Sequence, residues 1–155
     1  MGTFISMSKY LLYGLIALDG AEMDYKVFTS NLANLKRLKD SEESLKSQLD
    51  IIIYDLGGVK GVHYDSVMVH GNPSVIEEKR LELIDKYNEK EKELEFTKLA
   101  IMQTEETLNR MPKTLREMLI EVFVNGKTYR SVGEKYGYSY NGAWHYIKRE
   151  TEKYL

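Results

Sequence analysis

The sequence predicts an all-α protein, in which a long antiparallel helical hairpin of coiled-coil type is followed by a small C-terminal bundle of short helices. Only two prolines occur among the 155 residues, which favours long uninterrupted helices. Two long segments with apolar residues at steps of three and four flank a glycine-rich stretch, and a more compact pattern follows the second proline. These features divide the chain into residues 1–24, 25–111 and 112–155.

The first division, residues 1–24, contains the apolar run YLLYGLIAL. This run is too short for a membrane-spanning helix, which needs about 20 residues. The acidic stretch DGAEMD follows it without the small-residue cleavage pattern of a signal peptide. We therefore expect no membrane association, and we expect this segment to pack on the long helices.

Residues 25–56 are predicted to form the first long helix. Apolar side chains recur at alternating steps of three and four residues, with Glu42 as the one polar member of the series. This spacing is typical of the contact seam of a coiled coil or a helical hairpin. The seam consists of Leu35, Leu38, Leu45, Leu49, Ile52 and Leu56, and Phe28 extends it toward the N-terminus.

A glycine-rich connector is predicted at 57–74. The glycines of its opening GGVKG are expected to end the first helix. Valines and a tyrosine around the following DS pair predict two short extended pieces joined by a turn. Ser74, with Glu77 three residues later, fits the N-cap of the next helix with its capping-box partner.

The second long helix is predicted from Val75 to Arg110. Its many Glu/Lys pairs four residues apart each support an exposed helix by roughly 0.3 kcal/mol. A helix this polar needs a partner, which is either the first helix of the same chain or a second copy, forming a homodimer through the long helices. Its weaker apolar series is Ile76, Leu83, Ile84, Tyr87, Leu94, Ile101 and Leu108.

Pro112 marks the start of a three-helix pattern, because proline restricts the residue before it. A break at NGKT leaves Thr128 to cap a short helix over residues 129–136. Ser139 is expected to cap a final helix that extends to about Tyr154. The first helix of the three presents the apolar face Leu115, Met118, Leu119, Val122 and Phe123.

Two glycines at a spacing of four, Gly133 and Gly137, predict a helix-turn-helix. A small residue inside the first helix allows the second helix to approach closely, and the later glycine forms the turn. The second helix then presents one polar face. The residues expected to join the two helices are Val132, Tyr136, Tyr138, Ala143 and Tyr146 or Ile147.

The segment MPKTLREMLIEVFVNGKTYRSVGEKYGYSYNGAWHYIKRE resembles the fourth region of bacterial sigma factors, which reads the -35 promoter element. VGEKYGYS follows the order of small residue, turn and cap in that family. More loosely, residues 25–155 resemble small phage-encoded regulators of gram-positive bacteria. In these, a long helical region with a "YD…V.G" segment, here Tyr64-Asp65 through Val69 and Gly71, precedes such a motif.

These resemblances imply sequence-specific binding of double-stranded DNA in transcription control of phage genes. They imply base contacts from Tyr140, Asn141, Trp144 and His145, and phosphate contacts from Lys127, Thr128, Arg130, Lys148 and Arg149. Asparagine can bond adenine through two hydrogen bonds, and aromatic rings can contact thymine methyl groups. Sigma factors carry arginines where Tyr140, Gly142 and Trp144 stand here, so the -35 specificity does not carry over.

Charge is unevenly distributed along the chain. Residues 112–155 hold eight Lys and Arg and five Asp and Glu, whereas residues 1–111 hold fourteen basic and nineteen acidic residues. The C-terminal third is therefore locally basic on an acidic carrier.

No catalytic residue, metal or cofactor is predicted. The chain has no cysteine, which removes thiolate chemistry and suits a reducing cytoplasm, here that of a bacterial host. His63, Asp65 and His70 fit no zinc spacing. The sequence contains no glycine-rich phosphate loop after a strand and no nucleophile elbow.

A second class of function stays open from the sequence. The chain also fits a coiled-coil adaptor whose C-terminal bundle binds protein, such as RNA polymerase. Tyr140, Trp144 and Tyr154 would then pack on the long helices or on a second subunit. A phage packaging subunit, which would form rings, is a related alternative.

Overall fold

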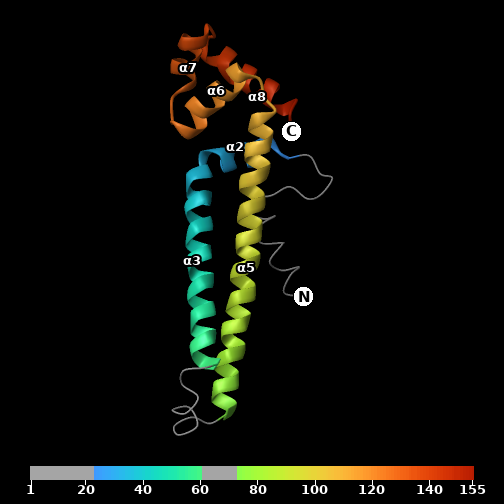
Figure 1. Ribbon diagram of the computed structural model, residues 1–155. Helices are drawn as coiled ribbons and strands as arrows, with labels where there is room; N and C mark the ends of the chain where they lie inside the picture. The colour runs from blue at the N-terminus through green and yellow to red at the C-terminus, as the bar shows by residue number, and fades with distance from the viewer. Residues whose placement is uncertain (1–22, 61–72) are drawn as a thin grey trace. The chain divides into compact units, whose positions relative to one another are not determined.

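The computed structural model describes residues 23–60 and 73–155, and the regular structure in these ranges is helical (Figure 1). The all-α prediction is therefore confirmed over this part of the chain. In chain order the elements are α2 (Tyr25–Ala33), α3 (Leu35–Lys60), α5 (Pro73–Asn109), α6 (Lys113–Leu119), the π-helical turn η1 (Ile120–Val124), α7 (Tyr129–Tyr136) and α8 (Tyr140–Glu152).

The chain divides into two compact units, and their boundaries differ from the predicted division at residue 112. One unit is Asp40–Phe96, which contains most of α3 and of α5. The other, the second unit, combines the described residues up to Lys39 with Thr97–Leu155. The C-terminal helices therefore belong to the same unit as α2 and the end of α5.

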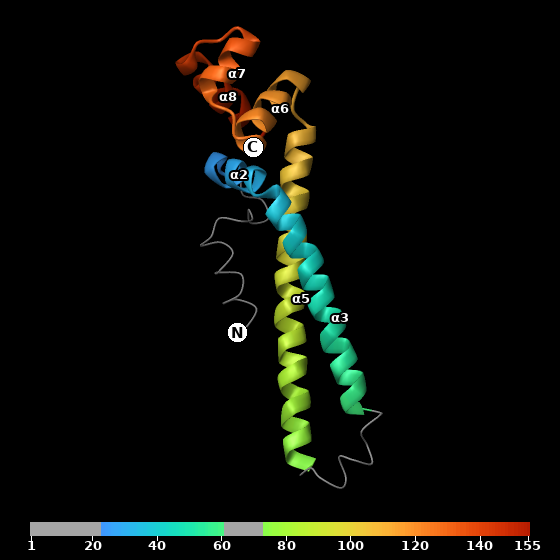
Figure 2. The ribbon, with the colours of Figure 1, turned by 90° about the vertical axis from the view of Figure 1, so that its left-hand side faces the viewer.

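The Asp40–Phe96 unit is an antiparallel pair formed by α3 and α5 of one chain (Figure 2). The predicted seam is confirmed at its centre, where Leu45, Leu49 and Ile52 are buried. Leu45 and Leu49 pack against Leu94 and the partly buried Tyr87 of α5. Because apolar burial drives this pairing, the weaker apolar series of α5 is sufficient where it meets the seam.

Asn34 interrupts the single helix that was predicted over residues 25–56. Asn34 is the C-cap of α2, with a non-helical φ of −102° and ψ of 12°, and its Nδ2 atom donates to the Ser30 carbonyl oxygen at 2.8 Å. α3 begins at the next residue, Leu35. Asparagine side chains that bind nearby backbone groups compete with the helical ladder, which accounts for the break.

The ends of the long helices also differ from the prediction. α3 continues through Gly57 to Lys60, so the prediction that the first connector glycines stop it was wrong. A glycine inside a helix costs only about 1 kcal/mol relative to alanine. α5 begins at Pro73, and Ser74 therefore lies inside the helix and not at its N-cap. Proline suits a first helical position, where its missing N–H would have no partner.

Two predicted features lie outside the described residues. The apolar run YLLYGLIAL lies within residues 1–22, and the two extended pieces predicted in the connector lie within residues 61–72. Within the described ranges, no helix combines the length and the apolar character needed to cross a membrane.

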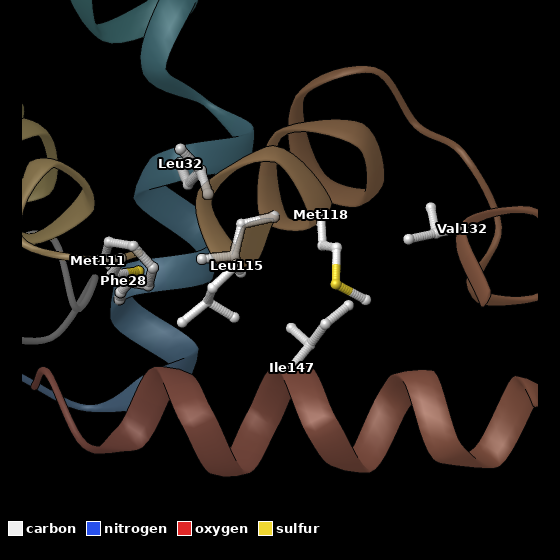
Figure 3. Packing of buried hydrophobic residues seen from close by; sticks show 8 residues of the cluster. Phe28, Leu32, Met111, Leu115, Met118, Val132 and Ile147 are labelled. Carbon is white, nitrogen blue, oxygen red and sulfur yellow. The ribbon is translucent and has the colours of Figure 1, made fainter. Parts of the chain in front are cut away.

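The core of the second unit joins α2 to the C-terminal helices (Figure 3). Phe28 and Leu32 of α2 are 0% and 1% exposed and belong to this core. The prediction that Phe28 extends the hairpin seam was therefore wrong. The other buried members are Met111, Leu115, Met118, Leu119, Val132 and Ile147. Burying one such side chain contributes about 1.5–3 kcal/mol, so α2 is a structural part of the bundle.

Candidate nucleic-acid interface

Helices α7 and α8 are two short helices joined by a tight turn where the helix-turn-helix was predicted, and both predicted caps are present. The Thr128 hydroxyl accepts the Ser131 N–H at 3.1 Å at the start of α7. The Ser139 hydroxyl accepts the Gly142 N–H at 3.0 Å at the start of α8. Each cap satisfies a backbone donor that a helix leaves without a partner in its first turn. α7 has the predicted bounds, and α8 ends at Glu152, slightly before the predicted end.

The two glycines have the roles that their spacing predicts. Gly137 has a φ of 83°, in the left-handed region that glycine adopts without strain, and ends α7. The Tyr138 N–H donates to the Gly133 carbonyl oxygen at 2.7 Å. A Cβ atom at Gly133 would lie 2.5 Å from the Tyr138 carbonyl oxygen. The close passage of the turn over α7 therefore requires glycine at Gly133.

A small apolar contact joins the two helices. Val132, Ala143 and Ile147 are fully buried, as predicted. At the edge of this contact the Tyr138 and Tyr146 rings are stacked, with centroids 4.9 Å apart. Together these contacts hold α8 so that its opposite face is exposed.

That exposed face carries the four predicted base contacts. Tyr140 is 53% exposed and Trp144 is 36% exposed, and Asn141 and His145 are also exposed. The Tyr140 ring meets the ring of Tyr129 edge-on, at a centroid distance of 6.1 Å. Neither ring is therefore buried within the unit to which α8 belongs.

The predicted phosphate contacts on α8 lie close to other side chains. Lys148 Nζ lies 5.4 Å from the centroid of the Trp144 ring, in a cation–π arrangement. The Arg149 side chain is 68% exposed and its Nε donates to Glu150 Oε1 at 3.2 Å. Exposed ion pairs of this kind are weak, so Arg149 is available to a phosphate.

The predicted phosphate contacts before and on α7 differ in their surroundings. Thr128 and Arg130 are exposed at the start of α7. Lys127, in contrast, lies 3.8 Å from the carboxylate of Glu121. Of Lys127, Thr128 and Arg130, only Lys127 forms one of the ion pairs found among the described residues.

Glu121 is a residue that the sequence analysis missed. It lies on η1, is only 9% exposed, and its Oε1 accepts a hydrogen bond from Lys135 Nζ as well as facing Lys127. The hydrogen bond from Lys135 is the main cause that lowers the pKa of Glu121, and the same bond raises the pKa of Lys135. Sequence separations of six and fourteen residues carry no helical signal, so the cluster was not predictable.

Tyr25 of α2 is a second residue that the sequence did not indicate. Its hydroxyl is buried beside Tyr129 of α7. Burial is the main cause that raises the pKa of Tyr25 well above its ordinary value of 10.0, and Tyr129 and Glu152 add to the effect. Tyr25 therefore links α2 to the start of the helix-turn-helix.

No metal site is formed by the residues that the structure covers, since they contain no group of three or more His, Cys, Asp or Glu side chains suited to an ion. The segment with His63, Asp65 and His70 lies outside them.

Comparison of the chain with models of known protein families, with curated protein sequences and with solved structures found no match. The geometry of α7 and α8 is therefore the observation from which a function is inferred.

Proposed function

We propose that this chain is a sequence-specific DNA-binding transcription regulator, which reads the major groove with α8. The observation that supports this most is the exposed face of α8, held outward by the glycine turn and by the burial of Val132 and Ile147 in one core. A helix-turn-helix places its second helix in the major groove, with the N-terminal residues at the base edges. The first two turns of α8 carry the polar and aromatic side chains that this geometry requires.

Each side chain on this face has chemistry suited to DNA. The Asn141 amide can donate to and accept from the edge of an adenine, and His145 can bond a base edge one turn later. Tyr140 and Trp144 offer apolar ring edges to thymine methyl groups. Arg130 and Arg149 supply guanidinium groups, and Lys148 an ammonium group, for phosphates on either side of the groove.

The long hairpin would give the protein its second partner. We propose that it forms a homodimer or contacts RNA polymerase in the control of phage genes. This proposal is supported by large apolar side chains on α3, where Ile51, Ile53 and Tyr54 are 60%, 53% and 80% exposed. Exposed apolar residues of this size, gathered within one helical turn, are typical of a protein contact.

The test of DNA binding is selection of binding sites from random duplex DNA, performed at two salt concentrations. We expect one sequence to be enriched, and we expect affinity to fall steeply with salt by about 0.9 logarithmic units per phosphate contact and per decade of salt. Loss of the selected sequence on substitution of Asn141 would assign the face. Recovery of unselected DNA at both salt concentrations would exclude sequence-specific binding.

The aromatic content of the same face favours a second candidate, a protein-binding adaptor. Tyr140 and Trp144 on this face are 53% and 36% exposed, and such rings are enriched at protein interfaces. An adaptor would bind its partner with little dependence on salt, and a packaging subunit would form rings. Light scattering after size exclusion separates a ring from a dimer.

A further inference from the structure

The Glu121 cluster, formed by Glu121, Lys127 and Lys135, joins three elements of the second unit. Glu121 comes from η1, Lys127 from the loop before α7, and Lys135 from α7. One carboxylate oxygen, Oε1, faces both ammonium groups: it accepts a hydrogen bond from Lys135 and lies 3.8 Å from Lys127. The other oxygen, Oε2, is buried and has no hydrogen-bond partner among the described residues.

The backbone of η1 creates this arrangement. The Asn125 N–H donates to the Ile120 carbonyl oxygen at 2.9 Å, five residues back, as in a π-helix. The Lys127 N–H donates to the Glu121 carbonyl oxygen, also at 2.9 Å. The wide turn therefore brings the Lys127 backbone directly beside Glu121, and its side chain lies over the carboxylate.

The two lysines are more exposed than Glu121, and this difference determines how strongly the carboxylate holds them against a competing phosphate. Their side chains are 49% and 57% exposed, whereas the Glu121 side chain is 12% exposed. A largely buried carboxylate retains a stronger attraction for a cation than an exposed one, since less water and salt separate the charges. A DNA phosphate would have to replace Glu121 as the partner of each lysine.

We propose that Glu121 is a positioning residue that withholds Lys127 and Lys135 from DNA phosphates, and so lowers the sequence-independent part of the affinity. This inference rests on the proposed DNA binding by α7 and α8. Phosphate contacts carry no sequence information, and non-specific affinity comes almost entirely from them. Glu121 therefore keeps the protein from binding any duplex tightly, while the base contacts of α8 are unaffected.

The test measures duplex affinity as a function of salt for Glu121→Gln, which keeps the shape of the side chain and removes its charge. Two released lysines would steepen the slope of log affinity against log salt by up to about 1.8. Lowering salt from about 200 mM to about 50 mM would then raise the affinity of the variant about 12-fold more than that of the parent. Selected and random duplexes should gain alike.

The matched control is Glu134→Gln, which makes the same change of net charge on α7 at an exposed residue adjacent to Lys135. It should leave the salt slope close to that of the parent. Equal slopes for Glu121→Gln, Glu134→Gln and the parent would overturn the inference, because long-range charge alone would then account for any change in affinity.

Substitution of Lys135 separates release from a purely structural role. In the parent, Lys135→Gln should leave the salt slope unchanged, because the lysine is held by Glu121. In the Glu121→Gln background, Lys135→Gln should reduce the slope of log affinity against log salt by about 0.9, because one phosphate contact is lost. Lys148→Gln, on the exposed face of α8, should lower the slope by the same amount in both backgrounds.

These outcomes remain decisive if Glu121→Gln does not fold, as circular dichroism would show. Loss of about 0.9 from the slope on Lys135→Gln in the parent would place that lysine on DNA and overturn the inference. A parent with no salt-dependent duplex binding would instead overturn the proposed function, and the inference with it. Normal DNA binding with unchanged slopes would overturn the inference alone.

Discussion

At the scale of single residues, the helix-turn-helix depends on a few atoms that sequence spacing places correctly. Gly133 has no room for a side chain, and Gly137 adopts a left-handed φ of 83°. Thr128 and Ser139 cap the two helices with hydrogen bonds of 3.1 and 3.0 Å. All four were predicted, because each acts on backbone within a few residues of itself.

Gly133→Ala is expected to lower the stability of the second unit. The added methyl carbon would lie 2.5 Å from the Tyr138 carbonyl oxygen, so the turn must move, at a cost of about 1–3 kcal/mol. Gly57→Ala is the control, because it lies in α3 with no atom within 4 Å of the added carbon. That change should stabilise the protein by about 0.5–1 kcal/mol. Calorimetric melting of both variants checks these signs, and a stable Gly133→Ala would contradict the geometry.

Substitutions on the face of α8 should divide into two kinds of effect. Asn141→Ala is expected to relax one base position, with a loss of about 1–3 kcal/mol of discrimination there. Lys148→Ala should weaken all duplexes alike and reduce the salt slope by about 0.9. Lys46→Ala, an exposed lysine of the hairpin unit paired with Glu42 at 3.2 Å, is the charge-matched control. Titration of a selected site and its single-base variants distinguishes the two effects, and parental binding by both α8 variants would remove this face from the site.

At the scale of elements, η1 links α6 to α7 in a way that an uninterrupted α-helix cannot. Its wide turn buries Glu121 and places it opposite Lys127 and Lys135. π-helical turns are rare and are frequently found at functional sites. The link between α6 and α7 therefore includes a largely buried carboxylate.

The stability of this link should depend on acid. The hydrogen bond from Lys135 lowers the pKa of Glu121 below its ordinary value of 4.5. Because the folded-state pKa is below the unfolded-state value, the stabilisation is complete above the ordinary pKa and is lost as pH falls through the folded-state pKa. Melting temperatures of the parent should therefore fall more between about pH 6 and about pH 3 than those of Glu121→Gln. The same acid dependence in both proteins would contradict this assignment, and Glu134→Gln should keep the parental loss.

At the scale of the whole molecule, the bundle that carries the proposed interface is completed by a helix from the other end of the chain. Phe28 and Leu32 of α2 share one core with Leu115, Met118 and Ile147. The C-terminal helices on their own would expose that core to water. The division of the chain by sequence order therefore differs from its division by packing.

Phe28→Ala is expected to destabilise the helix-turn-helix, although it is more than a hundred residues away in sequence. Truncating a buried phenylalanine costs about 3–5 kcal/mol, from lost burial and from the cavity left behind. Tyr54→Ala, an aromatic truncation at a side chain that is 80% exposed, should change stability by less than about 0.5 kcal/mol. Amide hydrogen exchange in α7 and α8 reports the effect, and unchanged protection in Phe28→Ala would show that α2 is dispensable.

Much of the geometry of α7 and α8 could be predicted from the sequence, because it depends on interactions between residues close in sequence. Helix caps, a left-handed glycine and apolar spacing depend on atoms within about one helical turn, which the chain itself brings together. The seam residues Leu45 and Leu49, the bounds of α7 and the outward face of α8 follow from such signals.

Contacts between segments far apart in the sequence could not be predicted from local signals and were found only in the folded structure. Nothing near Phe28 indicates that its partner is the C-terminal bundle and not the hairpin seam, since both offer apolar side chains. Nothing near Glu121 indicates that two lysines will meet it across a π-helical turn. Local propensity sets which segments are helical, but the choice of partner is made by burial and charge pairing over the whole unit.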